Sequence, residues 1–162
     1  MDRTETKAKR HYGRLELVCD AVSVVCLLVM FLLVALYWKQ LPELIPTHYG
    51  IDGLPNAWGG RGSILFSPLL SLFVFASLTG VRFLPASMYN FPVAVTEENR
   101  ERLLCLSRHL LAVLKACLIA AFLPMVIFQV KNQPLPGWYM AVFLIVVSVP
   151  VIVYLVLMVK NK

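Results

Sequence analysis

Charged residues are scarce in this sequence. Asp, Glu, Lys and Arg make up 15% of its 162 residues, whereas soluble domains carry about 25%. Hydrophobic residues make up 59%, and they are concentrated in four long runs rather than spaced as in an amphipathic helix. Little sequence remains outside these runs, which leaves no room for a separate catalytic domain. These features exclude a soluble globular fold and indicate an integral membrane protein.

The four apolar runs are long enough to cross a bilayer. They extend over residues 21–38, 64–81, 110–130 and 138–159, and about 18 consecutive apolar residues are typical of a transmembrane helix. The first run is longer than the apolar part of a signal peptide and lacks a small-residue cleavage site. The sequence therefore predicts one all-α transmembrane domain over residues 1–162, an integral membrane four-helix bundle with a structured extracytoplasmic loop. The helices are expected at about 15–38, 63–82, 97–130 and 138–159.

Basic residues are divided unevenly between the two sides of this predicted bundle. Lys and Arg near the ends of a membrane helix resist translocation. One side carries Arg3, Lys7, Lys9, Arg10, Arg14, Arg82, Arg100, Arg102, Arg108, Lys160 and Lys162, and the other carries Lys39, Arg61 and Lys131. This bias predicts a multi-pass protein of the cell membrane with both termini and residues 82–109 in the cytoplasm. The loops over residues 39–62 and 131–137 are then outside.

The net charge of +6 does not indicate nucleic-acid binding. The basic residues belong to separate segments, and no stripe of alternating basic and aromatic residues accompanies them. Attraction to anionic lipid headgroups is the simpler interpretation. The lipid bilayer is therefore the expected partner of these charges, and no nucleic acid is expected.

The long outer loop, residues 41–62, is rich in proline and glycine. It holds three of the ten prolines and five of the eight glycines. Proline fixes φ and glycine permits positive φ, so this composition predicts a series of defined turns, with Asp52-Gly53 as a turn signal. We expect an ordered cap in which apolar side chains fold onto the helix ends, namely Ile45, Ile51, Leu54 and Trp58. A flexible link between helices is the alternative.

The same loop offers weak signals for catalysis or metal binding. His48, Asp52 and Glu43 supply only three candidate ligands without a fixed spacing, so no metal and no other cofactor is expected. Thr47 and Ser63 lie near His48 in sequence, but nothing marks the strained turn of a nucleophile. No catalytic residue is predicted, and an interfacial enzyme that uses His48 stays open as an alternative.

Two sets of motifs carry a family resemblance. The outer loop contains Leu41-Pro42, Ile45-Pro46-Thr47-His48, Gly53-Leu54-Pro55 and Trp58-Gly59-Gly60-Arg61; the cytoplasmic segment contains Asn90-Phe91-Pro92-Val93, Thr96-Glu97-Glu98-Asn99 and Arg102. These motifs resemble those of small multi-pass bacterial membrane proteins, an uncharacterised domain family related to the sporulation-delaying toxin immunity proteins. The chain departs from the family pattern at Gly50, Asn56 and Arg61, where relatives commonly carry Asn, an acidic residue and Lys.

The resemblance implies a protein that, in the characterised branch, protects against a secreted peptide toxin and signals to a transcription factor. The candidate ligand-binding residues of the outer loop are Pro46, His48, Asp52, Gly53, Trp58 and Arg61. The cytoplasmic signature comprises Asn90, Pro92, Thr96, Glu98, Asn99 and Arg102. Thr96 is also expected to cap the third helix, because Glu97 and Glu98 favour the positive end of the helix dipole.

A buried charge cluster is a further expectation. The first and third helices enter the membrane from the same side, so Asp20 or Glu16 should lie level with Lys115 or Arg108. An ionisable group within a membrane bundle usually has a partner. The alternative for Lys115 is snorkelling to the headgroups.

Together these features predict a binding and signalling role, with immunity to a membrane-active peptide, or its sensing, as the particular form. The expected partners are a peptide toxin outside and a cytoplasmic regulator or larger membrane complex inside. An accessory subunit of a membrane transporter or enzyme complex is the structural alternative.

Overall fold

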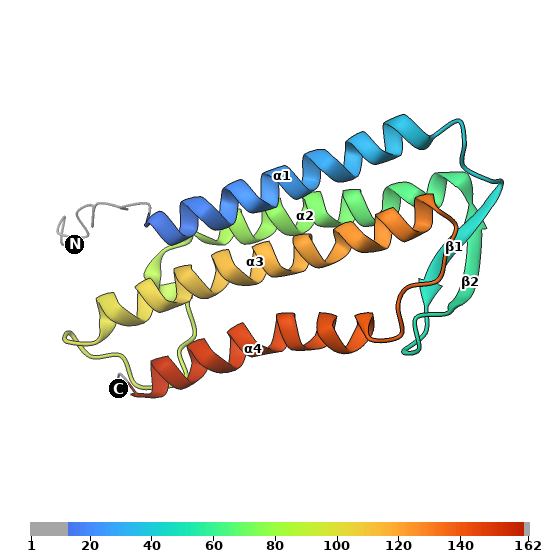
Figure 1. The fold of residues 1–162 in the computed structure, drawn as a ribbon. Coiled ribbons are helices and arrows are strands. Elements are labelled where there is room, and N and C mark those ends of the chain that lie inside the picture. Colours follow the sequence, from blue (N-terminus) through green and yellow to red (C-terminus); the bar gives the residue numbers. More distant parts are fainter. Residues whose placement is uncertain (1–12, 161–162) are drawn as a thin grey trace.

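Figure 1 shows four long helices with a small β-hairpin at one end of the bundle. The computed structural model describes residues 13–160. The elements are α1 (Arg14–Tyr37), β1 (Leu44–Tyr49), β2 (Pro55–Gly60), the 3-10 helix η1 (Arg61–Leu65), α2 (Phe66–Val81), the 3-10 helix η2 (Ala86–Met88), α3 (Arg100–Val130) and α4 (Tyr139–Lys160). The predicted helical membrane bundle is therefore confirmed. Five residues of the orientation argument lie outside the described part, namely Arg3, Lys7, Lys9, Arg10 and Lys162.

Four helical segments are long and apolar enough to cross a membrane: Arg14–Tyr37, Arg61–Val81, Arg100–Val130 and Tyr139–Lys160. Their outward faces consist largely of exposed aliphatic and aromatic side chains. Such surfaces are stable against lipid tails and unfavourable in water. The fold is thus that of a multi-pass membrane protein, in which the bilayer covers what the bundle itself leaves exposed.

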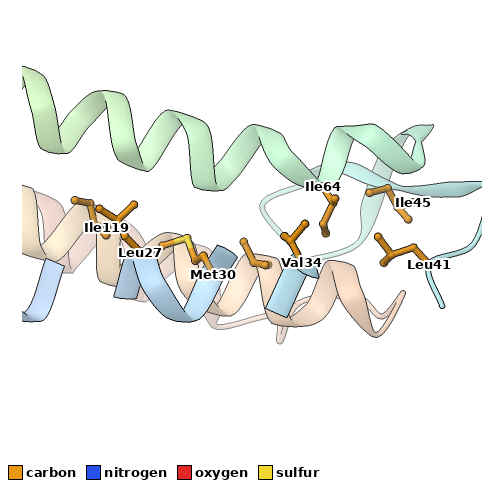
Figure 2. Packing of buried hydrophobic residues seen from close by; sticks show 8 residues of the cluster. Leu27, Met30, Val34, Leu41, Ile45, Ile64 and Ile119 are labelled. Carbon is orange, nitrogen blue, oxygen red and sulfur yellow. The ribbon is translucent and has the colours of Figure 1, made fainter. Parts of the chain in front are cut away.

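The core runs along the contact between α1, α2 and α3. Figure 2 shows part of it, where Leu27 of α1 lies beside Ile119 of α3, and Val34 lies further along α1 near Ile64 of η1. The helices α1 and α3 are parallel and α2 is antiparallel to both, while α4 packs against α3 (Figure 1). Ser71 of α2 is fully buried and contacts the Met30 sulfur at 3.8 Å. Small residues such as this serine allow close helix approach in membrane bundles.

The outer loop forms a two-stranded antiparallel hairpin. Leu44 pairs with Gly60 at its open end and Tyr49 with Pro55 near its turn, with irregular register around His48. The turn is the predicted Asp-Gly pair: Gly53 has a φ of 81°, which non-glycine residues rarely adopt. The loop is structured, as predicted, although its composition was interpreted as a series of turns rather than as strands.

The predicted apolar contacts of this loop are correct for one residue and wrong for three. Ile45 is fully buried in the core. Ile51, Leu54 and Trp58 are 80%, 55% and 52% exposed. Ile51 and Leu54 flank the turn rather than lie within a strand, and Trp58 belongs to β2, whose residues are mostly exposed.

Two hydrogen bonds fix the hairpin to the helices beneath it. The backbone N–H of Leu135, in the α3–α4 connection, donates to the Gly53 carbonyl at 2.9 Å. The Gln129 side chain of α3 donates through Nε2 to the Pro46 carbonyl at 3.0 Å. Tyr49 and Leu135 also share a small apolar cluster with Tyr139 of α4. The hairpin is therefore a cap built onto both ends of the α3–α4 connection.

Candidate functional site

The hairpin places the sequence-predicted outer residues along its length rather than in one pocket. Pro46 and Trp58 lie opposite each other in the ladder. Pro46 is fully buried. Asp52 and Gly53 form the turn, and Arg61 begins η1 at the open end of the hairpin, where its backbone N–H donates to the Glu43 carbonyl at 3.1 Å. The six residues thus form one continuous structure but not one ligand pocket.

His48 is held by a side chain of the opposite strand. Its Nδ1 lies 2.5 Å from Oδ1 of Asn56, and both residues are exposed. With the amide oxygen as acceptor, Nδ1 carries the proton and Nε2 of the neutral ring is an acceptor. Asn56 is one of the three positions at which the chain departs from the pattern that it resembles. Where that pattern commonly has an acidic residue, the histidine here contacts a neutral amide.

The Asp52 carboxylate forms a hydrogen bond within the turn. Its Oδ1 accepts a hydrogen bond from the Leu54 N–H at 3.0 Å. Within residues 13–160, no group of three His, Cys, Asp or Glu side chains is placed to hold a metal ion. What the outer surface offers chemically is hydrogen bonding and apolar contact.

A second set of predicted residues meets at the opposite end of the bundle. Asp20 Oδ1 lies 2.6 Å from Lys115 Nζ, and Asp20 Oδ2 lies 3.2 Å from Arg82. Glu16 Oε2 lies 3.1 Å from Arg82 and also accepts the Gly13 N–H. These charges join α1 and α3 with Arg82, which directly follows α2. Two carboxylates and two cations leave the cluster electrically neutral.

Lys115 is enclosed within the bundle. It is 1% exposed, its Nζ donates to the Thr79 hydroxyl at 2.9 Å, and the Nζ lies 4.7 Å from the centre of the Phe75 ring. The pairing expected for this lysine is confirmed, and snorkelling to the headgroups is wrong. The alternative cation, Arg108, has no ion pair within the described part of the chain.

The second cation of the charge cluster, Arg82, was not predicted, although its position in the sequence indicated it. Arg82 was interpreted only as one of the basic residues that predict the orientation. Because α2 is antiparallel to α1, the end of α2 reaches the level at which α1 begins. That geometry brings Arg82 to Glu16 and Asp20, whereas Arg108 lies about two turns before Lys115 on α3.

The cytoplasmic signature contains one compact hydrogen-bonded unit. The Thr96 N–H donates to Asn99 Oδ1 at 2.8 Å, the Asn99 N–H donates to the Thr96 hydroxyl at 3.3 Å, and Asn99 Nδ2 donates to the Ala94 carbonyl at 3.0 Å. The third helix begins at Arg100 with Asn99 as its N-cap, three residues after the predicted start. The prediction that Thr96 caps this helix is therefore wrong, because Thr96 and Asn99 close a separate turn that precedes it. The other signature residues, Asn90, Pro92, Glu98 and Arg102, are exposed.

The comparisons with known proteins agree with an uncharacterised family. Residues 25–72 match a family model described as "Domain of unknown function (DUF1648)". The match begins within α1, includes the whole hairpin and ends within α2. An "Uncharacterized protein" of Archaeoglobus fulgidus is 25% identical over 151 residues, with 82% of this chain and 81% of that protein covered. No solved structure matches the chain.

Proposed function

We propose that the hairpin end of this membrane protein binds a membrane-active peptide. The signature segment at the opposite end would signal this binding to a cytoplasmic regulator, or would anchor the protein to a larger membrane complex. The role that the family resemblance implies is immunity to that peptide. The observation that carries the proposal is the combination of a firmly held hairpin with exposed apolar and hydrogen-bonding side chains. The basic-residue bias predicts that this end faces the outside of the cell, where such a peptide would arrive.

The hairpin is preorganised for binding. Its turn and its first strand are tied to the bundle by the Gly53–Leu135 and Gln129–Pro46 hydrogen bonds. A surface that is already ordered loses less conformational entropy when a ligand binds. A loop that served only to connect two helices would not need these contacts.

The exposed side chains suit an apolar peptide. Ile51, Leu54 and Trp58 are each more than half exposed, and exposed apolar patches often mark interaction sites. His48 and Asn56 add polar atoms on the same hairpin. Tryptophan is among the residues that most often dominate binding energy, so Trp58 is the proposed anchor.

The backbone of β2 provides a second means of recognition. The sheet has two strands, and β2 exposes Asn56, Ala57 and Trp58. No third strand pairs with β2 in the chain between residues 13 and 160. Its outer edge therefore presents N–H and C=O groups to which an extended peptide can add as a strand.

Protection of cells is the direct test. Cells that express the protein are challenged with a panel of purified membrane-permeabilising bacterial peptides, and the inhibitory concentration of each peptide is measured. We expect protection against at least one peptide, and Trp58→Ala and His48→Ala should remove it. Trp138→Ala is the matched control, because Trp138 is 64% exposed but lies outside the hairpin. Equal sensitivity with and without the protein across the panel would contradict immunity.

The structure gives less support to an interfacial enzyme. His48 contacts an amide rather than a carboxylate that could orient it as a general base. An accessory subunit would instead copurify in fixed proportion with a larger complex, which distinguishes that role from a stand-alone binding protein.

A further inference from the structure

A groove of about 640 Å³ lies beside the hairpin, where β1, η1 and α2 meet the end of α3. It is open to the surroundings on one side. The residues that line it are Thr47, Gly62, Ser63, Leu65, Phe66, Leu69 and Gln129. None of them is charged, so the groove offers no opposite charge to a phosphate or an ammonium group.

One end of the groove is polar, and its lining residue Gln129 carries a hydrogen-bond acceptor without a partner. Gln129 is 3% exposed, and its Nε2 is held by the Pro46 carbonyl. Its Oε1 is buried and has no hydrogen-bond partner in the described part of the chain. A buried acceptor without a donor is unfavourable, because it has lost its hydrogen bond to water. A ligand that donates a hydrogen bond to Gln129 would restore what was lost.

Two hydroxyl residues approach each other at the same end because Gly59 has no side chain. A Cβ at Gly59 would lie 2.7 Å from both Ser63 Oγ and Thr47 Cγ2. Any larger residue would have to displace the Ser63 hydroxyl and the Thr47 methyl group. The approach of these two side chains therefore depends on the glycine.

The other end of the groove is apolar and lies on the first turns of a membrane span. The span begins at Arg61, and Phe66 and Leu69 are 68% and 52% exposed on its surface. This part of a transmembrane helix meets the boundary between headgroups and acyl chains. The molecules available to an open, uncharged groove at that depth are lipids.

We propose that this groove binds a neutral lipid with a hydroxyl headgroup, of the diacylglycerol class. The headgroup hydroxyl donates to Gln129 Oε1, beside Thr47 and Ser63, and an acyl chain follows Leu65, Phe66 and Leu69. Lipids with phosphate or ammonium headgroups are disfavoured because the groove holds no opposite charge. This inference is independent of peptide binding and adds a lipid site next to the proposed peptide surface.

The experiment uses the full chain in phosphatidylcholine nanodiscs with a photoreactive diacylglycerol. After illumination, mass spectrometry locates the adducts, which we expect at residues 61–69 and near Gln129. Unlabelled dioleoylglycerol should compete, whereas its 3-acetyl ester should compete about tenfold less well, because it lacks the donor. Equal competition by the ester would overturn the assigned hydrogen bond and with it the headgroup class.

Two glycine variants distinguish lipid binding in the groove from general contact between lipid and the helix surfaces. Gly62 lines the groove and Gly60 does not, and a Cβ at either meets nothing within 4 Å. Gly62→Phe should fill the groove and lower labelling about tenfold, while Gly60→Phe should label as the unaltered protein does. Labelling that is unchanged in Gly62→Phe, or spread evenly over all exposed helix faces, would overturn the proposal. Trp58→Ala should not affect labelling, so failure of the peptide proposal would be seen separately.

Discussion

The ammonium group of Lys115 lies 2.6 Å from Oδ1 of Asp20, although the two residues belong to different helices. A charged side chain at the centre of a membrane helix costs roughly 2.5–3.5 kcal/mol on insertion scales. The carboxylate offsets that cost only if α1 and α3 are parallel and in this register. The pair therefore stabilises one particular arrangement of the two helices.

Removal of the lysine should destabilise the bundle. Lys115→Met removes the cation that contacts Asp20 Oδ1, and breaking a buried ion pair costs about 3 kcal/mol. We expect lower abundance in the membrane and a lower midpoint of denaturant unfolding in detergent. Arg108→Met is the matched control, because Arg108 lies on the same helix and has no ion pair within residues 13–160. Equal losses in the two variants would contradict a specific pair.

The coupling between the two residues is best measured with neutral variants. A charge swap of Asp20 and Lys115 would place a lysine beside Arg82, which also contacts Asp20. A double-mutant cycle with Asp20→Asn and Lys115→Met avoids this repulsion. The two effects should be strongly non-additive. Simple additivity would show that the residues act independently.

The hairpin turn gives a further prediction. Gly53 has a φ of 81°, and a Cβ at this position would lie 2.4 Å from the Leu135 carbonyl oxygen. Gly53→Val should therefore be destabilised by more than the 1–3 kcal/mol or so of backbone strain alone, and Gly53→Ala should show a smaller loss. Gly60→Ala is the control, since its new Cβ meets nothing within 4 Å. Increased proteolysis of the hairpin in membranes would report the loss, and wild-type resistance in Gly53→Val would contradict the turn.

The helices were predictable because length and hydropathy determine a membrane span almost independently of tertiary contacts. The similar depth of Asp20 and Lys115 in the bundle was also predictable, because it follows from the rise per residue of two helices that enter from the same side. Strands β1 and β2 were not predicted, because proline and glycine interrupt the alternation that normally identifies a strand. The groove was not predictable either, since it depends on Gln129 of α3 reaching Pro46 of the hairpin. Such a contact between distant segments leaves no local pattern in a single sequence.

The predicted orientation can be tested with introduced cysteines. Asn56 is exposed on β2, and Glu97 is exposed in the opposite segment. In a Cys105→Ser background, Asn56→Cys should react with an impermeant thiol reagent in intact cells. Glu97→Cys should react only after permeabilisation. Asn99 is unsuitable, because it is 7% exposed and a cysteine there would be shielded on either side. Labelling of Glu97→Cys in intact cells would reverse the assigned orientation.

The buried hydroxyl of Tyr49 gives a prediction about alkaline pH. Burial raises the pKa of Tyr49 to about 12, compared with about 10 in an unfolded chain. The hydroxyl has no hydrogen-bond partner within the described residues, so nothing in the folded protein stabilises the phenolate. The folded state therefore keeps its proton at pH values where the unfolded state has lost it.

The sign of the effect follows from proton binding. The contribution of Tyr49 to stability is complete below pH 10 and is lost as the pH rises towards 12, with a total of about 2–3 kcal/mol. Tyr49→Phe removes the titrating group while keeping the ring that packs against Leu135 and Tyr139. Below pH 10 this variant should be at least as stable as the unaltered protein, because it removes a buried hydroxyl that has no hydrogen-bond partner. Thermal unfolding in detergent between pH 9 and 12, measured for both proteins, should then show the steeper alkaline decline only in the protein that retains Tyr49. Parallel declines would mean that another group, and not the Tyr49 hydroxyl, determines the alkaline limit.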